Sequence, residues 1–234
     1  QYDVTPGEIT VAAGEQVAVT IAPKGQKAPP LAVAPLDAEQ AKKYQQLWAD
    51  YLGVPVEREI GLAGGVKLTM VLIPPGEFVM GSTEAERQRP LEEAKAANDA
   101  WMIARISAEG PQHRVRITVP FYLGKHEVTQ AQWQAVMDSN PSKFQAPSNP
   151  VEQVSWDDVQ PFLAKLNVPG PRRVRSAKTT VATSQTKYAR PTEAQWEYAC
   201  RAGTTTAYYF GDSEAMLGEY GWFTSNSGGK THPV

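Results

Sequence analysis

The chain has 234 residues, of which 41% are hydrophobic and 21% charged, a composition typical of a globular protein. Its formal net charge of −2 provides no global attraction to phosphate backbones or anionic lipids, so we expect no nucleic-acid partner. The most apolar stretch, residues 68–80, is interrupted by two prolines and a glutamate and is shorter than the roughly 20 residues of a membrane helix. No membrane segment is therefore predicted.

The sequence contains one cysteine, Cys200, so this chain can form neither an internal disulfide nor a thiolate metal cluster. This count does not identify the cellular compartment. Residue 1 is Gln rather than Met, no secretory signal follows it, and the last residues contain neither a helix stop nor a polar tail. We expect the chain to belong to a longer protein with a further domain upstream.

At the N-terminus, residues 8–21 alternate apolar and polar side chains on both sides of a short turn, which is the pattern of a β hairpin. A single hairpin is only marginally stable in water, so residues 1–22 are predicted to be the end of a small β domain. A linker rich in proline and alanine is expected over residues 23–36.

A helix and a connection are predicted over residues 37–61, leading into a main domain over residues 62–234. Asp37 can cap the helix, and Gln40 stands three residues later at the capping-box position. Two short strands are expected within residues 66–80, which contain a Pro-Pro-Gly turn.

The middle of the main domain combines helical and strand patterns. Residues 82–110 are charged and rich in alanine, and we expect them to be partly helical. Alternation over residues 115–119 predicts a half-buried strand that continues through residues 121–123. Three helices with N-terminal signals follow, and their caps are Thr129 with Gln132, Ser155, and Thr192 with Gln195. Short strands and helices joined by long loops indicate an α+β domain.

The three capped helices carry one tryptophan each, and these are assigned to the structural core: Trp133, Trp156 and Trp196. Cys200 lies four residues after Trp196 and so shares its helical face. We therefore interpret Cys200 as a buried structural thiol, because a reactive thiolate needs exposure and positively charged neighbours.

No catalytic, cofactor-binding or metal-binding residue is assigned. The three histidines are too widely separated for a local metal motif. Asp157 and Asp158 stand in the first turn of a helix, where carboxylates complement the helix dipole, and capping explains them better than acid–base chemistry. Trp222 and Asn226 lie in a stretch rich in glycine and serine, and we regard them as candidates for a ligand-binding surface.

Five segments have a more specific pattern. They are VLIPPGEFVMGS (71–82), EGPQHRV (109–115), FYLGKHEVT (121–129), NPVEQVSWDD (149–158) and RPTEAQWEYACRAG (190–203). In this order they resemble the domain of the formylglycine-generating-enzyme, or sulfatase-modifying-factor, family, and the resemblance covers about residues 62–234. It implies a C-type-lectin-like α+β fold with much irregular structure, preceded here by the short β hairpin.

The resemblance also implies a chemistry for active family members. They oxidise a sulfatase cysteine to formylglycine with oxygen and a copper-binding cysteine pair, and they bind calcium at a tryptophan-rich motif. The main ligands of both metals are expected beyond Val234. One calcium site of the family begins with Asn, whereas this chain has Glu219-Tyr220-Gly221-Trp222. No cofactor is therefore assigned to this chain.

Two functions remain open. The first is a non-catalytic binding or regulatory module with a protein partner, for which a sulfatase-type polypeptide is one candidate, since the family domain is often appended to others, including bacterial kinases. The alternative is the N-terminal scaffold of an oxidase that converts a sulfatase cysteine to formylglycine, with its catalytic cysteines beyond the end of this chain. We favour the first for this chain, because an absent nucleophile cannot be activated.

Overall fold

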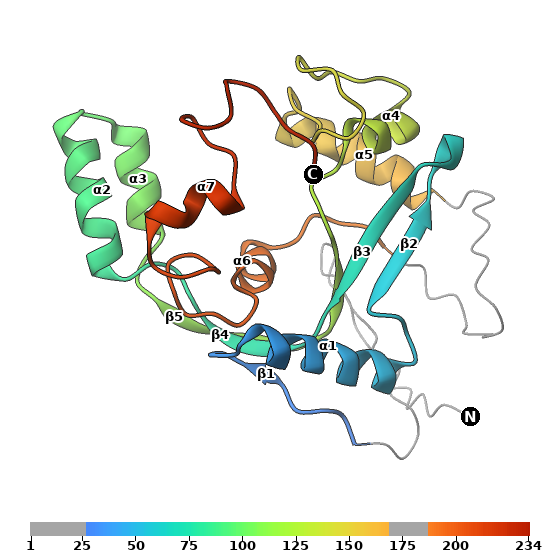
Figure 1. Ribbon diagram of the computed structural model, residues 1–234, viewed down its shortest axis with the longest axis horizontal. Helices are drawn as coiled ribbons and strands as arrows, with labels where there is room; N and C mark the ends of the chain where they lie inside the picture. Colours follow the sequence, from blue (N-terminus) through green and yellow to red (C-terminus); the bar gives the residue numbers. More distant parts are fainter. Residues whose placement is uncertain (1–26, 169–186) are drawn as a thin grey trace, which may run out of the picture. The chain divides into compact units, whose positions relative to one another are not determined.

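The computed structural model describes residues 27–168 and 187–234, and within them two three-stranded sheets are formed (Figure 1). The chain divides into two units of interleaved segments. The first unit contains the described residues up to Val56, with Leu72–Phe121 and Pro191–Ser213. The second contains Glu57–Val71, the described residues of Tyr122–Arg190, and Glu214–Val234. The hairpin expected at residues 8–21 lies outside the described residues.

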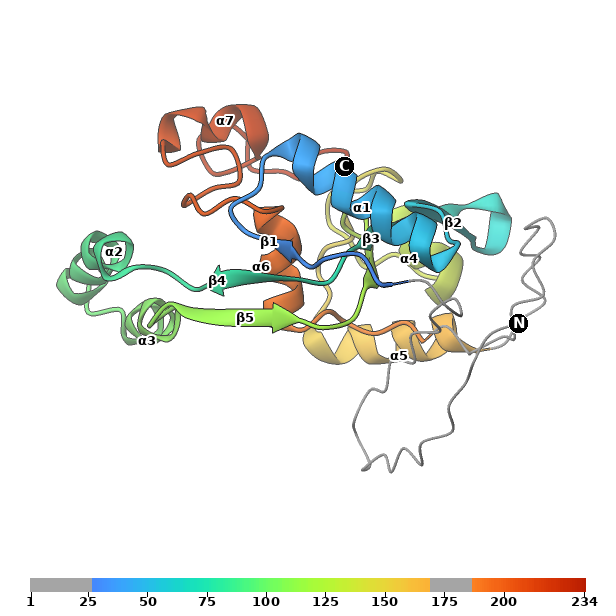
Figure 2. The same ribbon diagram turned by 90° about the horizontal axis from the view of Figure 1, so that it is seen from below.

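The sheet of the first unit has the strand order β1-β4-β5, formed by β1 (Ala32–Val33), β4 (Gly76–Met80) and β5 (His113–Ile117). β1 is parallel to β4, and β5 is antiparallel to it. Figure 2 shows β4 and β5 side by side. The predicted half-buried strand over residues 115–119 is therefore present as β5, although it begins and ends two residues earlier.

Gly76 lies where β1 and α6 (Glu193–Arg201) both approach β4. A Cβ atom built on Gly76 would be 2.1 Å from the Ala32 carbonyl oxygen and 2.1 Å from the Tyr198 hydroxyl oxygen. Both distances are far inside van der Waals contact. Only glycine therefore allows β1 and α6 to pack this closely on the start of β4.

Three helices of the first unit come from the segments in which helix was predicted. α1 (Ala38–Leu52) begins with the predicted capping box, in which the Asp37 carboxylate accepts from the Gln40 amide at 2.8 Å. It ends at Gly53, whose φ of 64° is in the left-handed region. α2 (Glu84–Ala96) and α3 (Ala100–Ala108) lie side by side within the charged segment (Figures 1 and 2).

The core of the first unit joins α6 to the sheet. Phe78, Ile117 and Tyr198 are buried together, and the Phe78 and Tyr198 ring centroids are 5.4 Å apart. The Gly81 amide and Arg201 Nε both donate to Glu197 Oε1, at 2.9 and 2.8 Å. This carboxylate thus ties α6 to the residue that follows β4.

The other sheet has the strand order β2-β3-β6, formed by β2 (Glu57–Gly61), β3 (Lys67–Ile73) and β6 (Phe121–Gly124). Most of its residues belong to the second unit, whereas Leu72, Ile73 and Phe121 are counted with the first. β2 and β3 pair antiparallel and are joined through a short 3₁₀ turn, η1 (Ala63–Gly65). The expectation that one strand runs from residue 115 through residue 123 is wrong. β5 and β6 belong to different sheets, and Pro120 between them lacks the amide that a continuous ladder requires.

The core of the second unit lies between α4 (Gln130–Met137) and α5 (Trp156–Asn167), both of which begin with the predicted caps. The Trp133 and Phe162 rings stack with centroids 4.9 Å apart and an angle of 2° between their planes. Leu166 is buried with them.

Gln130, the first residue of α4, is 1% exposed and holds the loop that follows the helix. Its Nε2 donates to the Phe144 and Pro150 carbonyls at 2.8 and 3.4 Å. Its Oε1 accepts from Asn140 Nδ2 at 2.9 Å and from the Ala146 amide at 3.0 Å. One amide side chain therefore satisfies four polar groups, and nothing in the local sequence pattern indicated that it would be buried.

The C-terminal segment of this unit contains η2 (Glu214–Met216) and α7 (Leu217–Tyr220) and is otherwise irregular. In the part of the chain that is described, none of the helices is both long and apolar enough to span a bilayer.

Candidate binding surface

Of the four residues expected in the core, Trp133 is buried, with 4% of its surface exposed. Trp196 is 58% exposed and Cys200 is also exposed, so their assignment to the core is wrong. The two residues do share a helical face, as their spacing predicts, but the face that packs on β4 carries Tyr198, which is 7% exposed. Helical spacing predicts which residues share a face of α6, but it does not predict which face packs against the sheet.

Cys200 nevertheless lacks the environment of a nucleophile. Desolvation raises the pKa of its thiol, and the Glu197 carboxylate raises it further, while Arg201 opposes both. At neutral pH the protonated thiol therefore predominates over the thiolate.

Trp156 is 65% exposed, and its assignment to the core is also wrong. It is the first residue of α5 and lies outside the stripe that buries Phe162 and Leu166. The Arg190 guanidinium lies 2.8 Å from the centre of the Trp156 ring and provides a cation–π contact.

Asp158 has the capping role expected from its position. Its carboxylate accepts from the hydroxyl and the backbone amide of Ser155, at 2.6 and 2.7 Å. These two hydrogen bonds lower the pKa of Asp158, because they stabilise the ionised carboxylate.

Residues 220–232, here called the aromatic loop, contain both candidate ligand-surface residues. Trp222 is 61% exposed, and one face of its ring stacks on His232 with centroids 3.8 Å apart. Tyr220 and Phe223 add exposed aromatic area within the same loop, at 47% and 39%. No local sequence signal connected Trp222 with His232, which lies ten residues later.

Asn226 fixes the loop rather than projecting from it. Its Oδ1 accepts from the Phe223 amide at 2.7 Å, and its Nδ2 donates to the Gly221 carbonyl at 2.9 Å. His232 Nε2 donates to the Ser227 carbonyl at 2.8 Å. The backbone on both sides of Trp222 is therefore hydrogen-bonded to the Asn226 side chain.

A second set of bonds attaches the aromatic loop to the rest of its unit. The Nδ2 atom of Asn149, a buried residue, donates to the carbonyl and the hydroxyl oxygens of Thr231, at 3.1 and 3.0 Å. The Val234 amide donates to the Ser148 carbonyl at 3.2 Å. These contacts attach the end of the aromatic loop, next to His232, to the segment around Asn149.

The metal-ligating side chains of the described residues are scattered. No three of the described His, Cys, Asp and Glu residues gather as a group that could hold a metal ion. A copper site of the kind the family uses needs two thiolates, and the sequence has one cysteine. We therefore derive no reaction step through copper or calcium.

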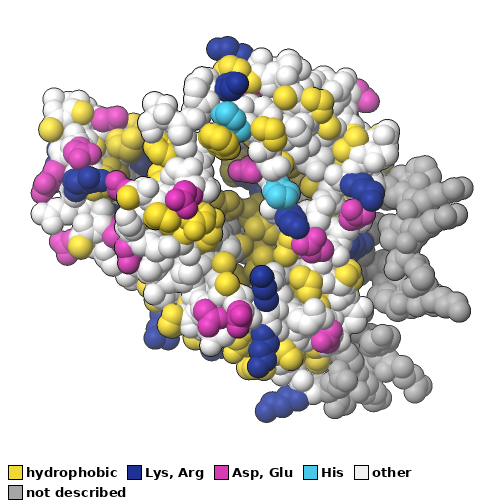
Figure 3. Space-filling view, viewed as in Figure 1, with side chains coloured by type: hydrophobic (Ala, Val, Ile, Leu, Met, Phe, Trp, Pro, Cys, Tyr) yellow, Lys and Arg dark blue, Asp and Glu magenta, His cyan; other side chains and the backbone are white. Residues whose placement is uncertain are grey.

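Charged side chains of both signs are interspersed on the face drawn in Figure 3. That face shows no broad area of one sign.

These features define the class of protein. It is an α+β protein with much irregular structure, and it exposes the aromatic loop. The model of the sulfatase-modifying factor enzyme 1-like domain family matches residues 63–234, and the chain belongs to that family. This confirms the resemblance, and the fold of this family is C-type-lectin-like.

The chain is similar to two individual proteins. Over 129 residues the chain is 31% identical to the chaperone protein LppX of Paenibacillus barcinonensis, a match that covers 47% of this chain and 46% of that protein. The chain thus spans about half the length of this curated relative. Among solved structures it resembles Treponema denticola variable protein 1 with a TM-score of 0.57 and 26% identity, covering 77% of this chain and 69% of the other.

Proposed function

We propose that this chain is a non-catalytic polypeptide-binding module of the sulfatase-modifying-factor family, with Trp222 at the centre of its binding surface. The observation that carries this proposal is the exposed Trp222 ring, which is supported on one face by His232 and held by the Asn226 hydrogen bonds. Tryptophan is enriched among the residues that dominate binding energy at protein interfaces. A ring that is already fixed also loses less conformational entropy on binding.

A polypeptide is the partner class that the remaining observations favour. Three aromatic side chains of the aromatic loop are exposed, Tyr220, Trp222 and Phe223, and their rings suit apolar segments of another chain. The curated relative LppX is named a chaperone protein, and a chaperone acts on polypeptides.

A non-catalytic role is supported by the cysteine chemistry. Cys200 is the one thiol of the chain, and its raised pKa keeps it protonated. Oxidation of a substrate cysteine by the family chemistry needs a pair of cysteines.

Replacing Trp222 with Ala is expected to weaken polypeptide binding about tenfold, the typical loss when a central aromatic residue of an interface is truncated. The measurement is fluorescence anisotropy with a labelled polypeptide kept unfolded by reduction and alkylation. The melting temperature is expected to stay close to that of the parent, because the ring is largely exposed.

The matched control is Trp101→Ala. Trp101 is 62% exposed and also has a stacking neighbour, because the Arg105 guanidinium lies 4.5 Å from its ring centre. This variant should bind the polypeptide like the parent. An equal loss in both variants, or no binding by the parent, would contradict the proposed surface.

The chain is expected to leave a Cys-x-Pro-x-Arg peptide unconverted in the presence of oxygen and copper. Mass spectrometry of the peptide would detect the aldehyde if it formed. Formation of aldehyde by the parent, and its loss in Cys200→Ser, would favour the oxidase alternative.

A further inference from the structure

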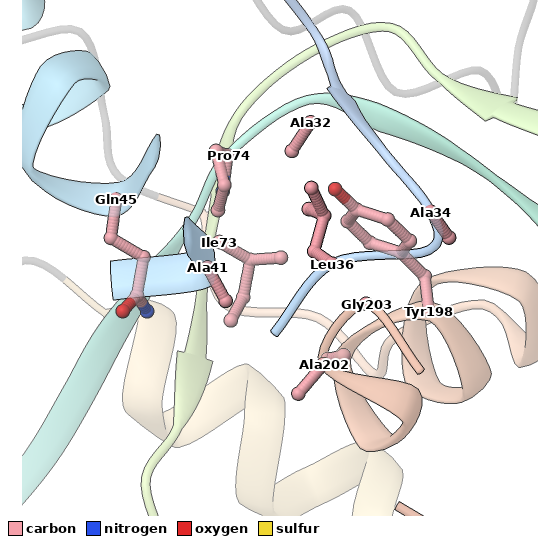
Figure 4. A pocket seen from close by; sticks show the side chains of 11 residues that line it. Ala32, Ala34, Leu36, Ala41, Gln45, Ile73, Pro74, Tyr198, Ala202 and Gly203 are labelled. Carbon is pink, nitrogen blue, oxygen red and sulfur yellow. The ribbon is translucent and has the colours of Figure 1, made fainter. Parts of the chain in front are cut away.

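The first unit contains a pocket of about 120 Å³ that has no part in the proposed polypeptide-binding surface (Figure 4). β1 and the residues after it, the start of α1, the end of β3 and the end of α6 form its wall. All of the lining residues belong to the first unit.

The wall of this pocket is apolar and uncharged. Leu36, Ile73 and Pro74 contribute its larger apolar surfaces, and alanines and a glycine line most of the remainder. No Asp, Glu, Lys, Arg or His side chain lines it. An ionised ligand would therefore lose its hydration without gaining a partner.

Two polar side chains reach the pocket, and they differ in their bonding. Gln45 Nε2 is already engaged, since it donates to the Leu72 carbonyl at 3.0 Å. Tyr198 is 7% exposed, and its hydroxyl makes no hydrogen bond to any of the described residues. In Figure 4 the Tyr198 ring extends from α6 towards Leu36 and Ala32.

The state of the Tyr198 hydroxyl follows from its burial. Burial raises the pKa of Tyr198 to about 12, because the phenolate would be poorly solvated. At neutral pH the group is therefore a protonated donor. Because the hydroxyl makes no hydrogen bond to the described residues, it is available to a ligand that accepts from it, and such a hydrogen bond makes a modest favourable contribution to binding.

We propose that this pocket binds a small neutral molecule with a compact hydrocarbon body and one hydrogen-bond acceptor, which takes the Tyr198 hydroxyl as its donor. The volume sets the size of the ligand. An apolar protein cavity of about 150 Å³ accommodates benzene, so a ring of five or six atoms is the appropriate scale. A ligand this small is expected to bind with a dissociation constant on the order of millimolar.

The test is a titration of the full chain, with methyl-labelled Ile and Ala, by cyclopentanone, followed by NMR. The methyl resonances of Ile73 and Ala41, which line the pocket, are expected to shift and saturate. Tyr198→Phe keeps the ring that packs on Phe78 and removes the hydroxyl, so it should weaken cyclopentanone binding about fivefold, the loss of one hydrogen bond. Methylcyclopentane, which has no acceptor, should bind the parent and Tyr198→Phe equally.

Two substitutions in α1 test whether cyclopentanone binds in this pocket. Ala41→Leu places a larger side chain into the pocket and should abolish the saturable shift at Ile73. Ala38→Leu, at an exposed position of the same helix, should leave it unchanged. Ala34→Val fills the pocket from the other side and replaces Ala41→Leu if that variant does not fold.

The proposal is overturned if cyclopentanone gives no saturable shift in the parent, or if the pocket-filling variants bind it like the parent. Equal binding of cyclopentanone by the parent and Tyr198→Phe would overturn the role of the hydroxyl.

Discussion

Trp133→Ala is expected to reduce the free energy of unfolding by about 3–5 kcal/mol, the range measured when a buried aromatic side chain is truncated to Ala. Trp133 is 4% exposed and stacked on Phe162, so its removal leaves a cavity and an uncovered ring. A loss of this size is a large part of the stability of a typical domain. Chemical denaturation followed by circular dichroism would measure it.

Trp196→Ala is the matched control for this prediction. It removes the same side chain from a position that is 58% exposed, and we expect a change within about 0.5 kcal/mol. An equal loss of stability in the two variants would contradict the buried position of Trp133 or the exposed position of Trp196.

Gln130→Ala is expected to reduce the free energy of unfolding by roughly 3 kcal/mol. The substitution removes the partner of four polar groups, and each buried group left unsatisfied is unfavourable by about 1–3 kcal/mol, partly relieved where water can enter. The loop over residues 140–150 should become more mobile, so its backbone amides should exchange hydrogen faster than in the parent.

Gln134→Ala, on the exposed side of the same helix, is the control for that measurement and should leave both stability and amide exchange close to those of the parent. Unchanged exchange at the Ala146 amide in Gln130→Ala would show that Gln130 does not hold the loop.

Local signals in the sequence identified local structure well. The capping boxes at Asp37, Thr129 and Thr192 are all present. Each depends on two residues three positions apart, so its energetics are contained in the segment itself. The α+β class followed from the same local patterns.

Burial was predicted less well, because it depends on what packs against each element. Tyr198 was not singled out, although it is the buried aromatic residue of α6 and the one unpaired hydroxyl donor of the pocket. Its burial is determined by Phe78 on β4, which is remote in the sequence. Gln130 was missed for a related reason, since its partners lie in a loop without periodicity.

The candidate binding surface was predicted in part. The glycine-rich stretch around Trp222 indicated an exposed loop, and the ring is exposed. The stacking of that ring on His232 and the hydrogen bond from Asn149 to Thr231 could not be predicted. Both contacts join residues that are distant in the sequence, and local composition does not indicate them.

The hydrogen bond between Gly81 and Glu197 joins positions 116 residues apart. Because a ribosome makes the chain from its N-terminus, β4 is synthesised well before the helix that packs on it. At a synthesis rate of about 5–20 residues per second, β4 emerges roughly ten seconds before α6 can cover it. During that interval Phe78 has no Tyr198 to pack against, and the intervening residues of the second unit can already begin to collapse. The first unit is therefore completed late, and the nascent chain presents β4 without its α6 cover while about half of these 234 residues are made.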